Sequence, residues 1–274
     1  MSQGFLLFAH NNEEINYGLL AAWTAKRIAH YLNKPVSLVA DNRTLAQLKK
    51  SGQLKYFDQV IGFGNSYHQY KRYQDRSLTF HNYDRSHAWD LTPYNETMVI
   101  DTDIVIQSNA MNCVWNNRDD LVVCKRSVNA FDVTTTQLEF KRLSDTGIPF
   151  YWATEFYFRK TDESKVFFET CKWVRSHYGW LSGVYGVSSK LMRNDYVWSI
   201  ALHLLGGKQH ADWCPSLPWT LMHTTDRVNL HSIDSTVVVY DAEFGVRQVA
   251  GQDIHVMNKF DLVRLAAEEM RAIA

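Results

Sequence analysis

The sequence predicts an α/β fold, with a central, mostly parallel sheet flanked by helices. Residues 5–9 and 36–40 are uninterrupted apolar runs, as expected for strands buried on both faces. Between them, residues 16–32 carry apolar side chains at helical spacing, and the pattern stops at Lys34-Pro35. A strand, a helix and a strand within forty residues form a βαβ unit, which implies parallel strands joined by a right-handed crossover.

The later elements follow the same alternation less regularly. Asn16 is expected to cap the first helix. Further strands are predicted at residues 59–63, 97–100, 150–158 and 237–240. Further helices are predicted at residues 44–51, 84–91, 162–177, 196–205 and 261–274. Residues 71–85, which are polar and aromatic, and residues 125–148, which are low in periodicity, are expected to form loops. No repeat, low-complexity tract or linker interrupts the chain, so one domain is predicted over residues 1–274.

Composition narrows the possible classes of function. The 274 residues have a formal net charge of zero, which argues against a uniformly basic surface for non-specific nucleic-acid binding. The four cysteines show no C-x-x-C pair, so we expect reduced thiols and no zinc knuckle. No apolar run approaches the roughly 18 residues of a membrane span, and the N-terminal run is too short for a signal peptide. We therefore expect a cytoplasmic protein without a membrane partner.

The strongest local signal is Asp101-Thr102-Asp103, which has apolar residues on both sides. This pattern predicts two carboxylates at the end of a buried strand, where open α/β sheets bind their ligands. Two such carboxylates repel one another unless a cation or a hydrogen-bond donor compensates them. A divalent Mg²⁺ or Mn²⁺ shared with substrate phosphates fits this chemistry. The alternative is a turn in which aspartate serves as a turn former or helix cap.

Two other enzyme classes fit less well. Phosphatases of the haloacid dehalogenase type also place D-x-D after a strand, but near the N-terminus and followed by Gly-Thr. Here Ile104-Val105 follows the acids and a complete βαβ unit precedes them. A nucleotide-binding dehydrogenase needs G-x-G-x-x-G after its first strand. Gly62-Phe63-Gly64 lacks the third glycine and follows the third predicted strand.

Near the C-terminus, His255 and Lys259 form an H-x-x-x-K element. Together with Asp101 and Asp103, this element resembles the glycogenin-like and lipopolysaccharide-galactosyltransferase-like glycosyltransferases of the GT-A type. In those families the histidine is the third protein ligand of the metal and the lysine contacts the diphosphate. The Pro-Trp that usually follows the lysine is absent here, where Phe260 follows instead.

This resemblance implies a metal-dependent glycosyltransferase that uses Mn²⁺ (or Mg²⁺) and a nucleotide-diphosphate sugar, specifically a UDP-sugar. The implied metal ligands are Asp101, Asp103 and His255. The implied donor contacts are Ala9, His10, Asn11, Asp41, Arg85, Thr102 and Lys259. Asp195 and Glu155 are the candidates for a catalytic base. Glu155 is notable because an acid within an aromatic strand is costly unless it has a partner or a function, whereas Asp195 is equally suited to capping a helix.

The chain also looks like glycosyltransferases of large tailed phages, in residues 35–39, 91–94 and 193–196. Some enzymes of this kind add a sugar to a hydroxymethylated pyrimidine in DNA, which would place this protein in the host cytoplasm. Two acceptors stay open: such a DNA base, or a saccharide or protein hydroxyl. Candidate DNA contacts are Tyr67, His68, Gln69, Tyr70, Lys71, Arg72, Tyr73, Arg76, Arg126, Lys141 and Arg142. A non-catalytic nucleotide-sugar-binding protein is the alternative from another class. The sequence does not determine the stereochemistry or the oligomeric state.

Overall fold

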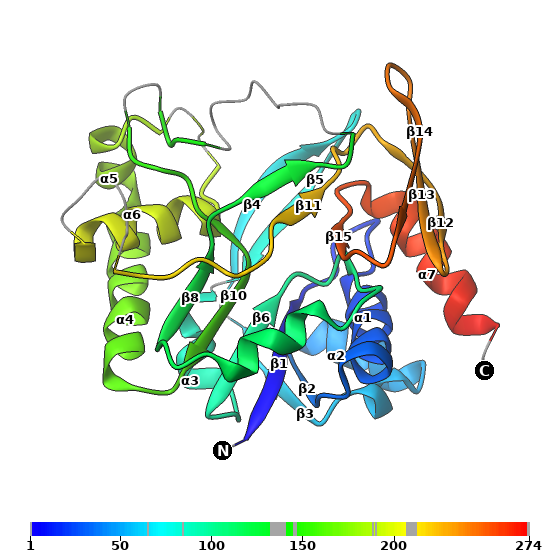
Figure 1. Cartoon of the computed structure of the whole chain (residues 1–274), viewed down its shortest axis with the longest axis horizontal. Helices are drawn as coiled ribbons and strands as arrows, with labels where there is room; N and C mark the ends of the chain where they lie inside the picture. The colour runs from blue at the N-terminus through cyan, green and yellow to red at the C-terminus, as the bar shows by residue number, and fades with distance from the viewer. Residues whose placement is uncertain are drawn as a thin grey trace.

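A computed structural model describes residues 2–64, 66–83, 85–131, 141–144, 147–187, 189, 191–206 and 213–272; at 66–68 and 82–83 only the backbone is described. The central sheet has six strands in the order β3-β2-β1-β6-β10-β8 (Figure 1). Their bounds are Gln59–Gly62, Val36–Ala40, Gln3–Ala9, Glu96–Ile100, Trp152–Arg159 and Leu121–Cys124, in that order. The first four are parallel, and β10 is antiparallel to both of its neighbours. The predicted α/β class with a mostly parallel sheet is therefore confirmed.

Helices lie on both sides of this sheet (Figure 1). In one group, α1 (Tyr17–Leu32) packs on β1 and β2, and α2 (Asn42–Lys50) and α7 (Lys259–Arg271) pack against α1. The other group lies beside β10: α4 (Asp162–Ser176), α5 (Tyr178–Val184) and α6 (Asn194–Gly206). Shorter turns of helix are η1 (Gln53–Tyr56), η2 (Arg85–His87), α3 (Ala88–Leu91) and η3 (Ala110–Asn116). Each long helix that the sequence predicts is present, with its ends shifted by a few residues.

Three smaller sheets accompany the central sheet. The first has the order β7-β15-β11-β9, with bounds Ile104–Val105, Ile254–His255, Leu221–His223 and Ser127–Asn129. The second is the antiparallel meander β12 (Asn229–Ile233), β13 (Thr236–Asp241) and β14 (Gly245–Ala250). The third is a hairpin of β4 (Ser66–Tyr73) and β5 (Arg76–Tyr83).

Two predicted loops are wrong in part. Most of residues 71–85 belongs to the hairpin, in which Tyr73 and Leu78 are buried. Its alternation of polar and apolar side chains is irregular, so periodicity alone missed the two strands. Within 125–148, strand β9 pairs with β11, a partner more than ninety residues away in sequence. Residues 132–140 and 145–146 of that predicted loop lie outside the described residues.

Side-chain caps fix where the helices begin. Asn16 accepts a hydrogen bond from the backbone N–H of Leu19 (2.9 Å), which confirms the predicted cap of α1. Asp41 caps α2 in the same way, through the N–H groups of Arg43 and Thr44. Asn258 caps α7 by accepting from the N–H of Asp261 (3.2 Å). Two predicted donor contacts lie at these caps. Asp41 is itself the cap of α2, and Lys259 is the first residue of α7, directly after its cap.

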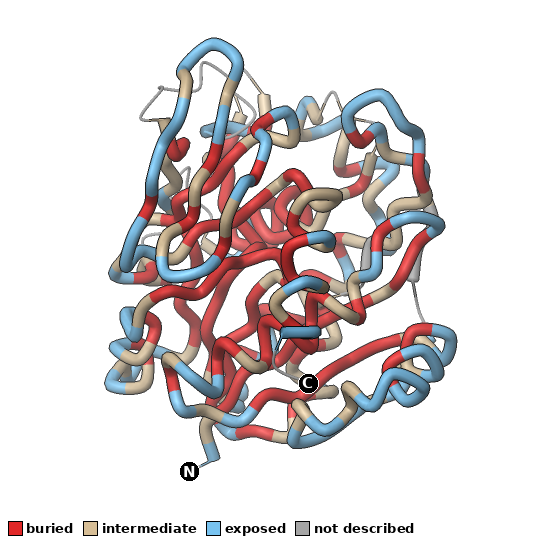
Figure 2. Tube along the Cα trace, turned by 90° about the vertical axis from the view of Figure 1, so that its right-hand side faces the viewer, coloured by how far each residue is buried: buried red, intermediate tan, exposed pale blue. Residues whose placement is uncertain are grey.

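Buried residues gather along the strands, while exposed residues lie at the periphery (Figure 2). One hydrophobic cluster extends from Phe5 in β1 to Met270 in α7, and Trp23, Trp152 and Trp198 are among its largest buried side chains. Several tryptophans therefore fill the core. Among the described helices, none combines the length and apolarity needed to cross a membrane.

Gly4 in β1 provides a test of packing against this core. A Cβ at this position would lie 2.4 Å from the ring of Tyr94, whose hydroxyl is tied to Ser37 (2.8 Å). We expect Gly4→Ala to lower the free energy of unfolding by about 1–3 kcal/mol, because the ring has to move. Gly183→Ala is the control, since a Cβ there meets nothing within 4 Å in α5. Chemical denaturation measures both, and equal stability of the two variants would contradict the packing described.

Candidate active site

A cavity of about 400 Å³ opens at the carboxyl ends of β1 and β6. Phe8 and His10 reach it from β1, and Asp101, Thr102 and Asp103 reach it from β6. The hairpin β4–β5, the first turns of α6 and α7, and residues of β10 and β11 also line it. Ligand sites of open α/β sheets occupy this position, as the sequence predicted for the two aspartates.

Three different elements hold the backbone of the D-x-D segment. The N–H of Asp101 donates to Thr154 O in β10 (2.9 Å). The carbonyl of Thr102 accepts from the hydroxyl of Thr24 in α1 (2.8 Å). The carbonyl of Asp103 accepts from the N–H of Val256 (3.0 Å), the residue after β15. The segment is therefore fixed at every residue, so the carboxylates start from a preorganised backbone.

His255 completes a group of metal-ligating side chains with the two aspartates. One ligand atom each from Asp101, Asp103 and His255 lies within 4.8 Å of the others. The Nε2 of His255 is 3.3 Å from Asp103 Oδ2 and 3.8 Å from Asp101 Oδ2. Two carboxylates and one imidazole suit a first-row divalent ion such as Mn²⁺, and the nitrogen favours it over Mg²⁺. The residues present thus fit the metal that the resemblance implies.

The same aspartates are also ion-paired with the chain's own cations. Arg85 Nη2 contacts Asp101, and Lys259 Nζ contacts Asp103. Burial by itself would raise the pKa of Asp103, but Lys259 and His255 outweigh burial and hold that pKa below its usual value. Both carboxylates are thus matched by a cation, as buried charges require. These two cations are also the residues predicted to contact a diphosphate.

Burial sets the charge state of the histidines in the site. It lowers the pKa of His255, even though Asp103 opposes the effect. His223, beside His255 in the small sheet, has its pKa lowered to about 4 by burial and by His255. A neutral imidazole is the form that binds metal, so His255 is available as a ligand at neutral pH.

Asp195 lies in the first turn of α6 and lines the cavity. Its Oδ1 accepts from the N–H of Ala153 (2.8 Å), and its Oδ2 pairs with Arg193 (2.7 Å). The carbonyl of the same Ala153 accepts from Arg85, so the backbone of this one residue of β10 links Asp195 to the cation on Asp101. The carboxylate is thus held within the cavity that contains the metal-ligating group.

Glu155, the other candidate base, does not line this cavity. Its carboxyl accepts a hydrogen bond from the indole N–H of Trp219 (2.7 Å) and is 1% exposed. Burial raises the pKa of Glu155 to about 8. The sequence signal, an acid within an aromatic strand, is therefore explained by a hydrogen bond from the half-buried Trp219.

The predicted donor contacts divide into two groups. His10, Arg85, Thr102 and Lys259 line the cavity, and the ring of His10 stacks on His81 with centroids 3.5 Å apart. Ala9, Asn11 and Asp41 do not line it. Asn11 Oδ1 accepts from the N–H of Gly18 (2.7 Å) and Asp41 caps α2, so both have structural partners.

Sequence reasoning missed several residues of the cavity. They come from elements far apart in the chain: Tyr17, Phe80, His81, Arg193, His223, Thr225, Asp226 and Met257. No motif marks them. His223 lies in β11, which pairs in parallel with β15, the strand that carries His255. Strands this short leave no clear pattern in the sequence, so the pairing could not be predicted from it.

No family model matches this chain, and no curated protein is similar to it in sequence. Among solved structures, the glycosyltransferase GlyE of Streptococcus pneumoniae TIGR4 superposes with a TM-score of 0.44 and 11% identity over 80% of this chain and 46% of GlyE. Galactosyltransferase LgtC, in complex with donor and acceptor sugar analogs, gives 0.42 and 11% over 76% and 80%. A cytidylyltransferase of Leptospira borgpetersenii gives 0.35 and 13% over 61% and 63%. TM-scores this low assign no activity, so the functional argument rests on the site.

Lys259 allows a test of whether its ammonium group competes with a metal ion for Asp103. We expect Lys259→Met to bind Mn²⁺ roughly tenfold more tightly without nucleotide, because the ammonium group no longer neutralises Asp103. The same variant should bind a nucleoside diphosphate more weakly. Calorimetric titration measures both affinities, with the exposed Lys49→Met as the control. Weaker Mn²⁺ binding by Lys259→Met would show that the ammonium group does not compete with the metal ion for Asp103.

Glu155 allows a test through pH dependence. Its folded-state pKa is raised from 4.5 to about 8, so it favours the folded state below pH 4.5 and this contribution is lost as the pH rises towards 8. We expect Glu155→Gln to remove a decline in unfolding free energy of up to about 1.4 kcal/mol per pH unit in that window. Denaturation across the window measures it, with the exposed Glu243→Gln as the control. A pH dependence unchanged by Glu155→Gln would show that this carboxyl is ionised in the folded protein.

Proposed function

We propose that this protein is a metal-dependent glycosyltransferase of the GT-A type, which moves a sugar from a nucleotide-diphosphate sugar to a hydroxyl acceptor. One observation carries the proposal. Asp101, Asp103 and His255 converge as a ligand group, with Lys259 and Arg85 beside them, at the carboxyl edge of a parallel sheet. The resemblance noted from the sequence implies the same five residues, and it also implies UDP as the nucleotide.

Charge balance explains what these residues do. Arg85 and Lys259 match the charges of Asp101 and Asp103. A divalent cation, when bound, neutralises charge that develops on the departing nucleoside diphosphate. The aspartates then have a second source of positive charge, which makes the guanidinium and the ammonium groups available to phosphate oxygens. Both cations stabilise negative charge best where it grows during the reaction.

Asp195 is the candidate for the group that handles the acceptor's proton. Of the two candidate bases, Asp195 lines the cavity and is paired with Arg193, whereas Glu155 lies outside the cavity. If the reaction inverts the anomeric centre, a base at this position takes the proton from the attacking hydroxyl. If it retains the configuration, the leaving phosphate can accept the proton and Asp195 positions the acceptor.

A hydroxymethylated DNA base gains little support as the acceptor. Of the cations predicted to contact DNA, Arg76 pairs with Glu14, and Arg126 donates to the carbonyls of Leu217 and Pro218. Arg72 donates to the carbonyl of Gln74. The side chains of Tyr67 and His68 lie outside the described residues. These three arginines therefore have partners within the protein, which leaves Lys71, Lys141 and Arg142 as the other described cations of this set.

The test of the proposal is release of nucleoside diphosphate from a panel of nucleotide sugars with Mn²⁺. We expect release by the wild type, and a loss of at least about a hundredfold in Asp103→Asn, because the amide is a poorer ligand for the metal. Asp241→Asn, at a turn of the β13–β14 meander, is the matched control and should keep full activity. Nucleotide-sugar binding without release from any donor would instead favour a non-catalytic binding protein.

Asp195→Asn separates the role of that residue from metal binding. We expect Mn²⁺ affinity to stay close to that of the wild type, because Asp195 is not in the ligand group. Transfer to an acceptor should fall by about 10²–10⁴-fold if Asp195 is the base. Parallel loss of Mn²⁺ binding would move Asp195 into the metal site.

A further inference from the structure

Lys71 is a charged residue of the proposed active site to which no role in the reaction has yet been given. It lies in β4 and lines the cavity together with Tyr73, which follows two residues later on the same face of the strand. Its Nζ is 5.2 Å from the ring centroid of Tyr73 and 5.4 Å from that of Phe80. The two aromatic rings attract the ammonium group and hold it within the wall of the cavity.

Among the described residues, Lys71 is the cation of this wall that has no carboxylate partner. The lysine and arginine side chains that line the cavity are Lys71, Arg85, Arg193 and Lys259. The last three are each paired with an aspartate of the same cavity, namely Asp101, Asp195 and Asp103. Lys71 makes no hydrogen bond or ion pair with any residue that the structure describes. A half-buried charge of this kind is unfavourable until an anion compensates it, so the wall presents one positive charge that a ligand can match.

The charged groups that act on Lys71 place it between two ion pairs. Burial, Arg193 and Lys259 together lower the pKa of Lys71 to about 8, against the opposing effects of Asp195 and Asp103. At pH 7 a lysine with this pKa is still mostly protonated. One ion pair belongs to the metal-ligating group and the other to the first turn of α6. Lys71 therefore lies beside the space between the metal-ligating group and the candidate base.

Asp226 is the other described carboxylate of the cavity wall, and it has a different partner. Its Oδ2 accepts a hydrogen bond from the backbone N–H of Gln74 (3.4 Å), at the turn of the hairpin. It is not among the charged groups that shift the pKa of Lys71. Asp226 thus does not compensate the ammonium group.

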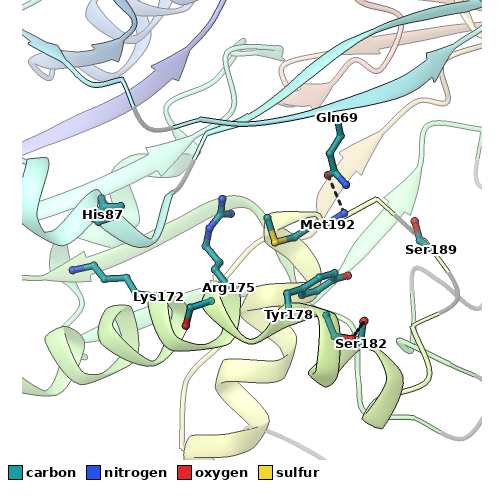
Figure 3. A pocket seen from close by; sticks show the side chains of 10 residues that line it. Gln69, His87, Lys172, Arg175, Tyr178, Ser182, Ser189 and Met192 are labelled. Atoms are coloured by element: carbon teal, nitrogen blue, oxygen red, sulfur yellow. Dashed lines mark hydrogen bonds between the residues drawn. The ribbon is translucent and has the colours of Figure 1, made fainter.

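Two hydrogen bonds anchor β4 on either side of Lys71. Two residues before it, the Gln69 side chain accepts from the backbone N–H of Met192 (3.0 Å), as Figure 3 shows. Two residues after it, the hydroxyl of Tyr73 is 3.3 Å from the hydroxyl of Tyr17. The first bond joins the strand to the segment before α6, and the second joins it to the start of α1. The position of Lys71 is thus fixed relative to both ends of the cavity.

We propose that Lys71 binds the diphosphate of the donor, at the phosphate that carries the transferred sugar. This assignment rests on the proposed function, in which the diphosphate lies at the metal-ligating group and the acceptor lies at Asp195. The bond that breaks then lies between these two, beside Lys71. Its electron pair stays on the departing phosphate oxygen, and the acceptor oxygen forms the new bond to the sugar. An ammonium group at this point stabilises the charge that develops on the departing oxygen.

Lys71 differs from the other two predicted diphosphate contacts in its dependence on the metal. Arg85 and Lys259 are paired with Asp101 and Asp103, so their charges become available when a metal ion compensates those aspartates. Lys71 has no described carboxylate to leave. The hairpin therefore supplies a positive charge for the diphosphate that does not depend on the metal.

Calorimetric titration of the full chain with UDP and with inorganic pyrophosphate tests this contact. We expect Lys71→Met to bind each probe about tenfold more weakly than the wild type, in Mg²⁺ and also in EDTA, because one charge-assisted hydrogen bond is lost. Lys71→Arg keeps the charge and should bind within about threefold of the wild type. The methionine side chain packs against the same two rings, so the melting temperature should stay close to that of the wild type.

Arg72→Met is the matched control for the loss of a positive charge. Arg72 is the next residue of β4, is exposed, and donates to the carbonyl of Gln74 (2.9 Å). We expect Arg72→Met to bind both probes as the wild type does. Equal losses in Arg72→Met and Lys71→Met would overturn the inference, because they would reflect net charge and not a contact.

The outcomes separate this inference from the proposed function. Pyrophosphate binding that Lys71→Met weakens and Arg72→Met keeps supports the inference, even if no nucleotide sugar is turned over. Equal binding by the wild type and Lys71→Met overturns it, and turnover of donor sugars would then leave the proposed function standing. Absence of binding of either probe by the wild type also overturns it. Unchanged diphosphate binding by Lys71→Met with weaker binding of single-stranded DNA overturns it too, and assigns Lys71 to a nucleic-acid acceptor.

Discussion

Two carboxylates fixed two residues apart in the wall of one cavity are the constraint on which this site depends. Asp101 and Asp103 are anchored through their backbones to α1, β10 and the segment after β15, so they have little freedom to separate. Buried like charges are tolerated only when cations compensate them. Arg85 and Lys259 provide that compensation, and His255 adds a neutral ligand. The surrounding sheets bring these three residues to one place from positions 85, 255 and 259.

The sequence predicted the parts of this arrangement that depend on local pattern. The parallel strands are continuous apolar runs, and the caps at Asn16 and the aspartates after β6 are visible from residue type and position. The group of Asp101, Asp103 and His255 was implied by a resemblance to a family, and the geometry now brings their side chains together. Periodicity alone does not predict that residues about 150 positions apart in the sequence lie together in the fold.

Other features lay beyond sequence reasoning because tertiary partners determine them. The hairpin β4–β5 reads as a polar segment, yet Tyr73 and Leu78 form a small buried cluster with Ile15, which the periodicity does not reveal. Glu155 looked catalytic because an acid in a buried strand needs a partner. That partner is Trp219, sixty-four residues later. Asp41 and Asn11 were read as ligand contacts, whereas their side chains make hydrogen bonds to nearby backbone N–H groups.

The central claim is that a divalent cation takes over the charge balance of Asp101 and Asp103 and frees Lys259 for a diphosphate. The most direct measurement is a crystal structure with Mn²⁺ and a nucleoside diphosphate, collected at a wavelength where manganese scatters anomalously. The account predicts an anomalous peak between Asp101, Asp103 and His255, with Lys259 moved from Asp103 to a phosphate oxygen. Nucleotide bound elsewhere, or Lys259 still paired with Asp103 and no anomalous peak, would contradict it.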